Sequence, residues 1–276
     1  KYSVAVSSGT AALEIAIKAL NIKENDEVLI PNFTIISNAL AVIRQQAKPV
    51  LIDCNLKDWN IKIEDIEKNI SKKTKAIIVT HIYSFPNEMD KILKICKKYN
   101  LLVIEDAAEV LGASYKNRMC GSFGDISTFS FYPNKHITTG EGGMIVTDDE
   151  LLAERCRSLR NLCFKNEQRF VHDELGWNYR FTNLQAAVGL AQLEKLNDHI
   201  QRKRAMGKLY NKLLSNMAKV QLPLSRTKYA ENIYWVYGII IKDNVSINAI
   251  DIMEKLSKKG IGTRPFFYPM HKQPVF

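Results

Sequence analysis

Along the first 150 residues, short apolar runs alternate with longer segments in which apolar residues recur every three or four positions. Most of the short runs are continuously apolar, which is typical of strands that are buried on both faces of a sheet. The predicted strands are 4–7, 27–31, 49–53, 76–80, 101–106, 126–131 and 143–148, and the predicted helices are 11–20, 37–46, 63–70 and 89–100. This alternation predicts an α/β fold, with a mostly parallel seven-stranded sheet between two layers of helices.

The pattern changes after residue 150. A helix is predicted over 150–161, a loop rich in aromatic and polar residues over 162–182, and a long helix, kinked or straight, over 183–217. An aromatic strand over 233–241 and a helix over 247–260 follow, which predicts a smaller C-terminal α+β domain. We therefore expect a large domain over 1–217 and a small domain over 218–276. The chain opens directly in a strand and ends without a closing element, so we expect it to be a piece of a longer chain.

Composition excludes several classes of protein. The chain is 46% hydrophobic and 25% charged, as ordinary soluble proteins are, and contains no apolar run of the roughly 18 to 20 residues that a membrane span needs. The formal net charge is +10, but the basic residues are scattered, which favours an anionic small molecule over nucleic acid. The five cysteines form no CxxC pair, so we expect reduced thiols in the cytoplasm and no metal site.

Two strand ends carry candidate chemistry, because ligands of such sheets bind beyond the carboxyl ends of the strands. Ser8, Gly9 and Thr10 lie between the first strand and a helix, where free backbone N–H groups can bind a phosphate; an ordinary helix cap has the same appearance. Asp106 ends the strand over 101–106. A buried carboxylate needs a cation or a donor, such as a protonated ring nitrogen, although a helix cap is again the alternative.

Lys135 follows the strand over 126–131, and Ser130 lies five residues before it. A lysine beside a sheet edge commonly extends its amine to solvent. Here Gly140, Gly142 and Gly143 crowd the next turn, which predicts a close approach of the backbone to a bulky group. A phosphate turn, an aspartate and a lysine at strand ends together suit pyridoxal 5′-phosphate, which the lysine would bind as a Schiff base.

Five segments of the chain, SSGTAAL, EDAAEVLGASY, FGDISTFSFYPNKHITTGEGGMIVTDD, LGWNYRFTNLQAAVGLAQLE and TRPFFYPMH, resemble the nucleotide-sugar aminotransferases of the DegT/StrS type. The resemblance covers nearly the whole chain and implies the fold-type I aminotransferase architecture, pyridoxal 5′-phosphate as cofactor and a homodimer. It is closest to the branch that makes GDP-perosamine from GDP-4-keto-6-deoxymannose and glutamate, for lipopolysaccharide O-antigen. A UDP- or dTDP-linked keto sugar is the alternative substrate, and a non-catalytic sensor or binding protein is the alternative from another class.

The resemblance also implies roles for individual residues. Lys135 would hold the cofactor, Asp106 would pair with its ring nitrogen, and Glu109 would lie close to it. The residues expected around the cofactor phosphate are Gly9, Thr10, Ala11 and Ser130, with Asn178 reaching the phosphate in the partner subunit. The site would therefore be shared across the dimer. Lysine at position 135 predicts transamination rather than the 3-dehydration of the branch that carries histidine there.

Four residues are candidates for substrate contacts: His81, Arg264, Tyr268 and His271. For His81 a structural hydrogen bond, and for the aromatic cluster around Tyr268 simple packing, are the alternatives. Two positions depart from the family pattern. Ile35 replaces an aromatic residue that stacks on the cofactor ring in many members, and Ser84 replaces a glycine.

Overall fold

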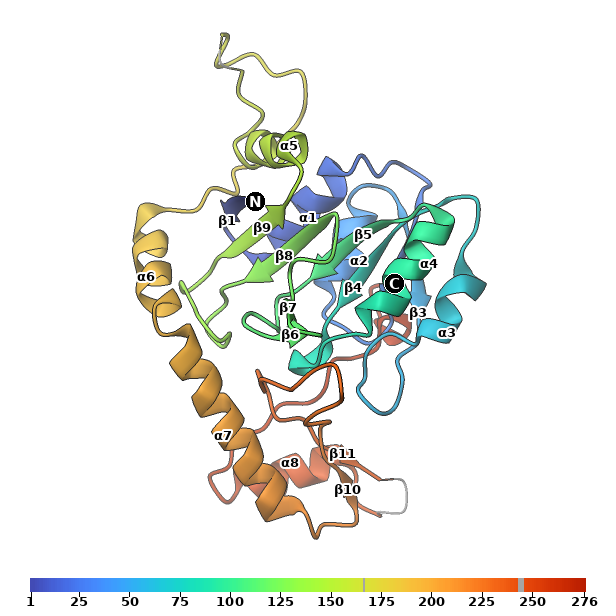
Figure 1. Ribbon diagram of the computed structural model, residues 1–276, viewed down its shortest axis with the longest axis vertical. Coiled ribbons are helices and arrows are strands. Elements are labelled where there is room, and N and C mark those ends of the chain that lie inside the picture. The colour runs from blue at the N-terminus through green and yellow to red at the C-terminus, as the bar shows by residue number, and fades with distance from the viewer. Residues whose placement is uncertain (166, 243–245) are drawn as a thin grey trace.

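A seven-stranded sheet in the order β1-β9-β8-β5-β4-β2-β3 forms the centre of the fold (Figure 1). It is seen in a computed structural model that describes residues 1–165, 167–242 and 246–276. β9 runs antiparallel to both of its neighbours and the other pairs are parallel, so the expected mostly parallel sheet is confirmed. The strands are β1 (Tyr2–Val6), β2 (Glu27–Pro31), β3 (Lys48–Ile52), β4 (Thr74–Thr80), β5 (Leu102–Asp106), β8 (Ile126–Ser130) and β9 (Gly143–Thr147).

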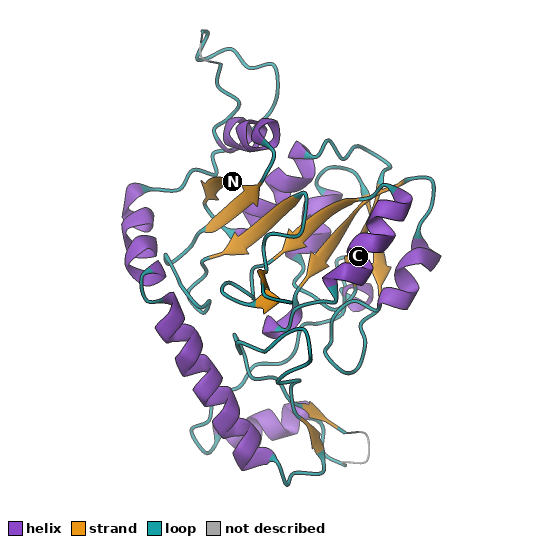
Figure 2. Ribbon diagram, viewed as in Figure 1, coloured by secondary structure: helices purple, strands orange, loops and turns teal. Residues whose placement is uncertain are grey.

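Helices cover both faces of the sheet (Figure 2). These are α1 (Gly9–Ala19), α2 (Ser37–Ile43), α3 (Ile63–Ile66) with the 3₁₀ turn η1 (Glu67–Asn69), α4 (Met89–Tyr99) and α5 (Glu150–Arg160). Val28 and Ile30 of β2 pack into a core with α1, α2 and α5, whereas Leu29 packs into a second core with α3 and α4. Because successive side chains of a strand point to opposite faces, two cores require a continuously apolar strand, which is the pattern of the sequence.

The remaining elements follow α5. α6 (Asn183–Leu193) and α7 (Leu196–Leu214) are separate helices, so the long helix predicted over 183–217 is interrupted at residues 194–195. None of the described helices is long and apolar enough to cross a membrane. The smaller elements are η2 (Ile82–Ser84), β6 (Ser114–Tyr115), β7 (Arg118–Met119), β10 (Val220–Gln221), β11 (Ile240–Ile241), α8 (Ala249–Ser257) and η3 (Met270–Lys272).

The aromatic strand predicted over 233–241 is wrong except for its last two residues, which form β11. Tyr234 has a φ of 50°, which a strand does not allow, and its N–H donates to the Oδ1 of Asn232 at 2.6 Å. The N–H of Trp235 donates to the Oγ of Ser84 at 2.7 Å. Side chains therefore accept the backbone N–H groups here. The ring of Trp235 packs in a cluster with Tyr83, whereas the ring of Tyr237 stacks on Tyr210 of α7.

The boundary expected between residues 217 and 218 stays a prediction. Figure 1 shows β10, β11 and α8 at the end of the molecule opposite α5, with α7 running toward them. Other parts of the C-terminal segment pack against the elements around the seven-stranded sheet: Met270 is buried in the core with α1, and Ile233 in a core with Phe129.

Candidate active site

The first turn of α1 lies against the end of β8. Ser8 caps the helix, and its Oγ accepts from the N–H of Ala11 at 3.0 Å. The N–H groups of Gly9 and Thr10 have no partner within the helix, because they belong to its first turn. A Cβ added to Gly9 would lie 2.8 Å from the Cβ of Ser130, so the two residues are in direct contact. The fold thus brings together the residues expected around the phosphate.

Asp106, at the carboxyl end of β5, is only 2% exposed. Its Oδ1 accepts from the N–H of Ala108 at 3.1 Å, and its Oδ2 accepts from the Oγ1 of Thr80 at 3.2 Å. Burial raises the pKa of Asp106, while the Ala108 N–H and the positive charge of Lys135 oppose the rise. Within the described part of the chain, Asp106 forms no ion pair within 4.0 Å. The carboxylate is therefore buried with neutral donors and without a counter-ion in direct contact.

Lys135 and Glu109 lie beside Asp106. Burial lowers the pKa of Lys135, and the carboxylates of Glu109 and Asp106 oppose this. Burial raises the pKa of Glu109 to about 7, which Lys135 opposes and Asp106 reinforces. The Oε2 of Glu109 accepts from the N–H of Tyr83 at 2.6 Å. An amine and a carboxyl that both titrate nearer to neutrality than usual can exchange protons, which is typical of active sites.

The glycines after Lys135 have a different cause from the one expected. A Cβ on Gly143 would lie 2.5 Å from the backbone oxygen of Ser8, and a Cβ on Gly142 would lie 2.6 Å from the Cε2 of Phe181. Gly140 has a φ of +81° and open space around it. The chain itself makes the close approach at Gly142 and Gly143, and a positive backbone φ accounts for Gly140, so these glycines are explained without a bulky ligand.

His81 is fully buried and has no free ring nitrogen. Its Nε2 lies 2.9 Å from the Oε1 of Glu105, and its Nδ1 accepts from the N–H of Asn87 at 3.0 Å. Glu105 also accepts from the N–H groups of Gly121 and Phe123 at 2.6 and 2.7 Å. These contacts favour the structural alternative for His81 over contact with a substrate. Cys120 lies near this pair, but the donors and acceptors of His81 and Glu105 are already satisfied without a metal.

The C-terminal segment reaches the end of β2. The N–H of Met270 donates to the backbone oxygen of Asn32 at 2.8 Å, and the side chain of His271 lies 2.9 Å from the Nδ2 of Asn32. Tyr268 is 56% exposed, and Arg264 is exposed as well. The segment that carries these three substrate candidates therefore lies at the edge of the sheet where a ligand would bind.

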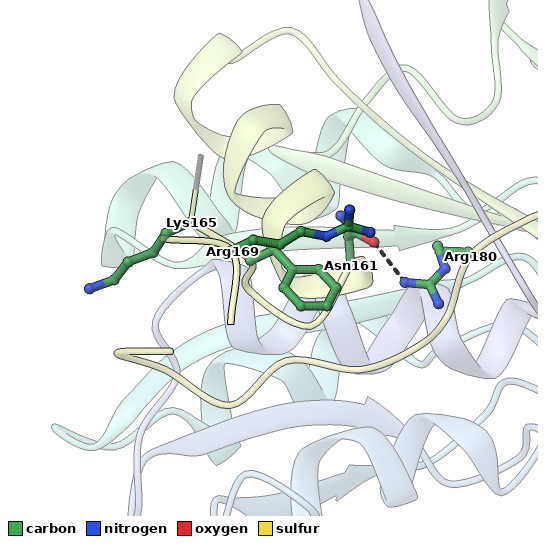
Figure 3. A pocket seen from close by; sticks show the side chains of 5 residues that line it. Asn161, Lys165, Arg169 and Arg180 are labelled. Atoms are coloured by element: carbon green, nitrogen blue, oxygen red, sulfur yellow. Dashed lines mark hydrogen bonds between the residues drawn. The ribbon is translucent and has the colours of Figure 1, made fainter. Parts of the chain in front are cut away.

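Asn178 lies in the segment between α5 and α6, where it pairs with Asn161 through a β-bridge. Beside it is a hollow of about 520 Å³ lined by Asn161, Phe164, Lys165, Arg169 and Arg180 (Figure 3). Arg180 donates to the Oδ1 of Asn161 at 2.8 Å. Arg169 and Arg180 make this hollow suited to an anion, whereas the Nζ of Lys165 is paired with Asp173 at 2.5 Å. Asn178 is exposed, and the described contacts do not link it to Lys135 of the same chain.

Three residues near Lys135 were not predicted as site residues: Tyr83, Ser84 and Trp235. Trp235 places its ring centroid 3.5 Å from the Nζ of Lys135. Tyr83 and Ser84 have φ angles of 48° and 72°, which are rare for residues with side chains. The only signal in the sequence is serine in place of the family glycine at position 84. The contact of Trp235 depends on the non-strand path of residues 232–238, which the pattern did not indicate.

Comparison with known proteins decides the family. The model of the DegT/DnrJ/EryC1/StrS aminotransferase family matches residues 1–276. The chain belongs to this family. As in other sugar aminotransferases of the DegT family, its cofactor is pyridoxal 5′-phosphate.

Relatives and solved structures agree with this membership. The chain is 41% identical to a GDP-perosamine synthase of Escherichia coli O157:H7, over all of this chain and 74% of that protein. It is 35% identical to a putative pyridoxal phosphate-dependent aminotransferase, EpsN, of Bacillus subtilis, over all of this chain and 72% of the relative. A crystal structure of DesV from S. venezuelae in complex with a ketimine intermediate superposes with a TM-score of 0.91 at 31% identity, covering 100% of this chain and 72% of DesV.

The residues at the strand ends fit the family cofactor. Asp106 is a buried carboxylate without a counter-ion, which a protonated ring nitrogen would provide. Gly9 and Ser130 touch beside the first turn of α1, where a phosphate finds backbone donors and the positive end of the helix. Lys135 lies close enough to interact electrostatically with both carboxylates. The first turn of α1, the buried carboxylate of Asp106 and the amine of Lys135 are thus of the chemical types that would hold the phosphate, the ring nitrogen and the aldehyde carbon of this cofactor.

Proposed function

We propose that this aminotransferase moves an amino group from glutamate to GDP-4-keto-6-deoxymannose, giving GDP-perosamine for a surface polysaccharide such as the lipopolysaccharide O-antigen. The 41% identity to a protein named GDP-perosamine synthase, across the whole chain, carries this proposal. The basic character of the chain, with a net charge of +10, suits a substrate that bears a diphosphate. The cysteines are all unpaired, in keeping with a reducing cytoplasm.

Each site residue has a role in this proposal. When bound, the cofactor supplies an electron-withdrawing ring that lets a proton leave the carbon next to an amine. Asp106 would keep the ring nitrogen protonated, because a buried carboxylate is strongly stabilised by a cation at its side. Gly9, Thr10, Ala11 and Ser130 would bind the phosphate and fix the orientation of the ring. Precise orientation of the reacting groups supplies a large part of the rate.

Lys135 would hold the cofactor and move the proton. Burial lowers the pKa of its amine, so more of the amine is neutral and able to accept a proton near pH 7. Glu109, with a pKa of about 7, is suited to keep or release a proton beside it. With Glu109 beside it, Lys135 would take the proton from the carbon that bears the donor's amino group and deliver it to the cofactor. It would run the same transfer in reverse on the carbon of the keto sugar.

We propose a homodimer with a shared site. α6 supports it: none of the eleven residues of α6 is buried, yet Leu184 is 83% exposed and Leu190 is 61% exposed. Exposed apolar side chains on one helix favour burial against a second copy of the chain. Asn178 and the cationic hollow lie next to this helix in sequence, so a dimer through α6 would carry them toward the partner subunit's cofactor and substrate.

The test is an assay of the purified full-length protein with glutamate and GDP-, UDP- and dTDP-linked 4-keto-6-deoxy sugars. We expect an amino sugar, detected by mass spectrometry, to form fastest with GDP-4-keto-6-deoxymannose. We expect Lys135→Ala to abolish it, with Lys91→Ala, an exposed surface lysine, as the matched control. Faster amine transfer to a UDP- or dTDP-linked sugar would show that the proposed substrate is wrong while the proposed reaction, amine transfer to a keto sugar, is right. Binding of the sugars without any amine transfer would favour a sensor or binding protein instead.

A further inference from the structure

The amine of Lys135 lies against the face of an indole ring. Its Nζ is 3.5 Å from the ring centroid of Trp235, well inside the roughly 6 Å at which a cation is attracted to an aromatic face. Within the described residues, this amine has no carboxylate within 4.0 Å and no hydrogen bond. Trp235 is 8% exposed, so its ring is desolvated as well. The ring is therefore the nearest partner of the free amine.

Contacts from three parts of the chain fix the indole in this place. The N–H of Trp235 donates to the Oγ of Ser84 at 2.7 Å. The indole Nε1 donates to the backbone oxygen of Asn134, the neighbour of Lys135, at 2.9 Å. The Nζ of Lys203, from α7, donates to the backbone oxygen of Trp235 at 3.1 Å. Two of these contacts hold the backbone of Trp235 and the third holds its ring nitrogen, so both the residue and the orientation of its ring are fixed.

Ser84 also connects the ring to the carboxylate side of the site. It adopts a φ of 72°, where glycine is free of strain and serine is not. Its hydroxyl donates to the backbone oxygen of Glu109 at 2.6 Å while it accepts from Trp235. A glycine, the residue that many family members have here, would relieve the backbone but lose both contacts. The serine thus links Glu109 to Trp235 through one side chain.

We propose that Trp235 is a positioning residue whose ring face holds the Lys135 amine whenever that amine is not bonded to the cofactor. The inference rests on the proposed function, because an aminotransferase must free its lysine in every cycle so that the amine can move a proton. An aromatic face attracts the ammonium group but offers no oxygen to bind it firmly. The amine therefore stays in place and remains available.

The charged groups around the amine come from several elements. Asp106 and Glu109 interact with it from the end of β5 and the segment that follows, His136 follows it in the chain, and the amine of Lys203 donates to the backbone oxygen of Trp235. The carboxylates favour the charged amine, while burial disfavours it. Like the carboxylates, the ring of Trp235 favours the charged form of the amine. Replacing it with an aliphatic side chain keeps the burial and removes this attraction, so the pKa of Lys135 should fall.

The test uses the protein loaded with pyridoxamine 5′-phosphate, in which Lys135 is free. Labelling of Lys135 by acetic anhydride, which attacks the neutral amine, is followed by peptide mass spectrometry between about pH 6 and 10. In Trp235→Leu we expect the midpoint of labelling to fall by about one pH unit, the size of a desolvated cation–π contact. Trp235→Phe should restore most of the shift. Ser84→Gly should shift the midpoint in the same direction by a smaller amount.

The matched control is Trp59→Leu. Trp59 is buried in the same aromatic cluster, with its ring 5.8 Å from that of Tyr83, but it has no contact with Lys135. An unchanged midpoint in Trp235→Leu, or an equal shift in Trp59→Leu, would overturn the proposal. The labelling experiment uses no sugar. Its result can therefore be interpreted even if the protein does not act on GDP-4-keto-6-deoxymannose. If the variants do not retain pyridoxamine 5′-phosphate, the same comparison is made on the apoprotein, where Lys135 is free as well.

Discussion

Glu105 and Asp106 are adjacent carboxylates with opposite environments. Glu105 accepts hydrogen bonds from His81 and from backbone N–H groups such as that of Gly121. Among the described residues, Asp106 accepts only from one hydroxyl and one N–H group. Burial alone would raise the pKa of Glu105, but His81 and the N–H groups outweigh it and lower that pKa. For Asp106 burial wins, and its pKa is raised. The hydrogen bonds of Glu105 therefore stabilise the fold, whereas the carboxylate of Asp106 would be stabilised further by a cation beside it.

The pH dependence of Glu105 follows from its lowered pKa. Stabilisation by such a group is complete above its pKa in the unfolded chain and is lost as pH falls through its lower pKa in the folded chain. We expect Glu105→Gln to reduce the free energy of unfolding at pH 7 by about 2 to 3 kcal/mol, because buried N–H groups lose their acceptor. The deficit should shrink below about pH 4, where the wild-type carboxylate also becomes protonated.

Urea unfolding at a series of pH values measures this. Glu24→Gln, on the surface, is the control and should leave the free energy of unfolding almost unchanged at every pH. A deficit that stays the same from pH 7 to pH 3 would contradict the assignment of the effect to the charge of Glu105.

At the scale of elements, the exposed leucines of α6 lead to a prediction about how two copies of the chain assemble. If the proposed dimer forms through α6, Leu190→Glu should convert it to a monomer, because a charge buried in an apolar interface costs more than the interface gains. Leu151→Glu is the matched control, since Leu151 of α5 is 82% exposed and outside α6. Size-exclusion chromatography with light scattering measures the masses. A dimer that survives in Leu190→Glu would place the interface elsewhere.

The regular elements were predictable from the sequence, and the irregular ones were not. Strands such as Glu27–Pro31 could be placed because two cores demand a continuous apolar run there. The segment over 233–241 has equally strong strand composition, but its backbone bonds to side chains of Ser84 and Asn232. Such partners lie far away in sequence or depend on single φ angles, which no periodicity records. The break between α6 and α7 was left open for the same reason.

The same limit applies to the candidate site. Asp106 could be proposed because it ends a predicted strand and Lys135 because it follows one, and the carboxyl ends of parallel strands meet at one edge of the sheet. Trp235 reaches the site through a turn that the pattern did not indicate. His81 also ends a strand, yet its side chain turns into the protein. A position at a strand end therefore identifies a candidate site residue. The direction of its side chain then distinguishes a structural residue from one that can contact a ligand.

For the whole molecule, a shared site can be tested by mixing two inactive variants. We expect Lys135→Ala and Asn178→Ala to be nearly inactive alone. In a mixed dimer, one site combines the intact Lys135 of one subunit with the intact Asn178 of the other. Refolding the two variants together in equal amounts should therefore restore about a quarter of the wild-type rate, because half of the dimers are mixed and each has one good site.

The rate of amine transfer measures this recovery. As a control, Lys135→Ala mixed with itself should remain inactive. No recovery in the mixture, with mixed dimers present by mass spectrometry, would contradict a site that is shared between subunits through Asn178.

The adjacency of Glu105 and Asp106 has a consequence for how this chain can change over time. In β5 the pleat sends one carboxylate to each face, so the pairing of β5 with β4 and β8 decides which acid lies beside Lys135, where we propose that the cofactor binds. Substitutions elsewhere in the strand alter packing, but inserting or deleting one residue would exchange the two acids. Descendants of this sequence should therefore vary in the side chains of residues 102–104 and keep the length of that stretch constant.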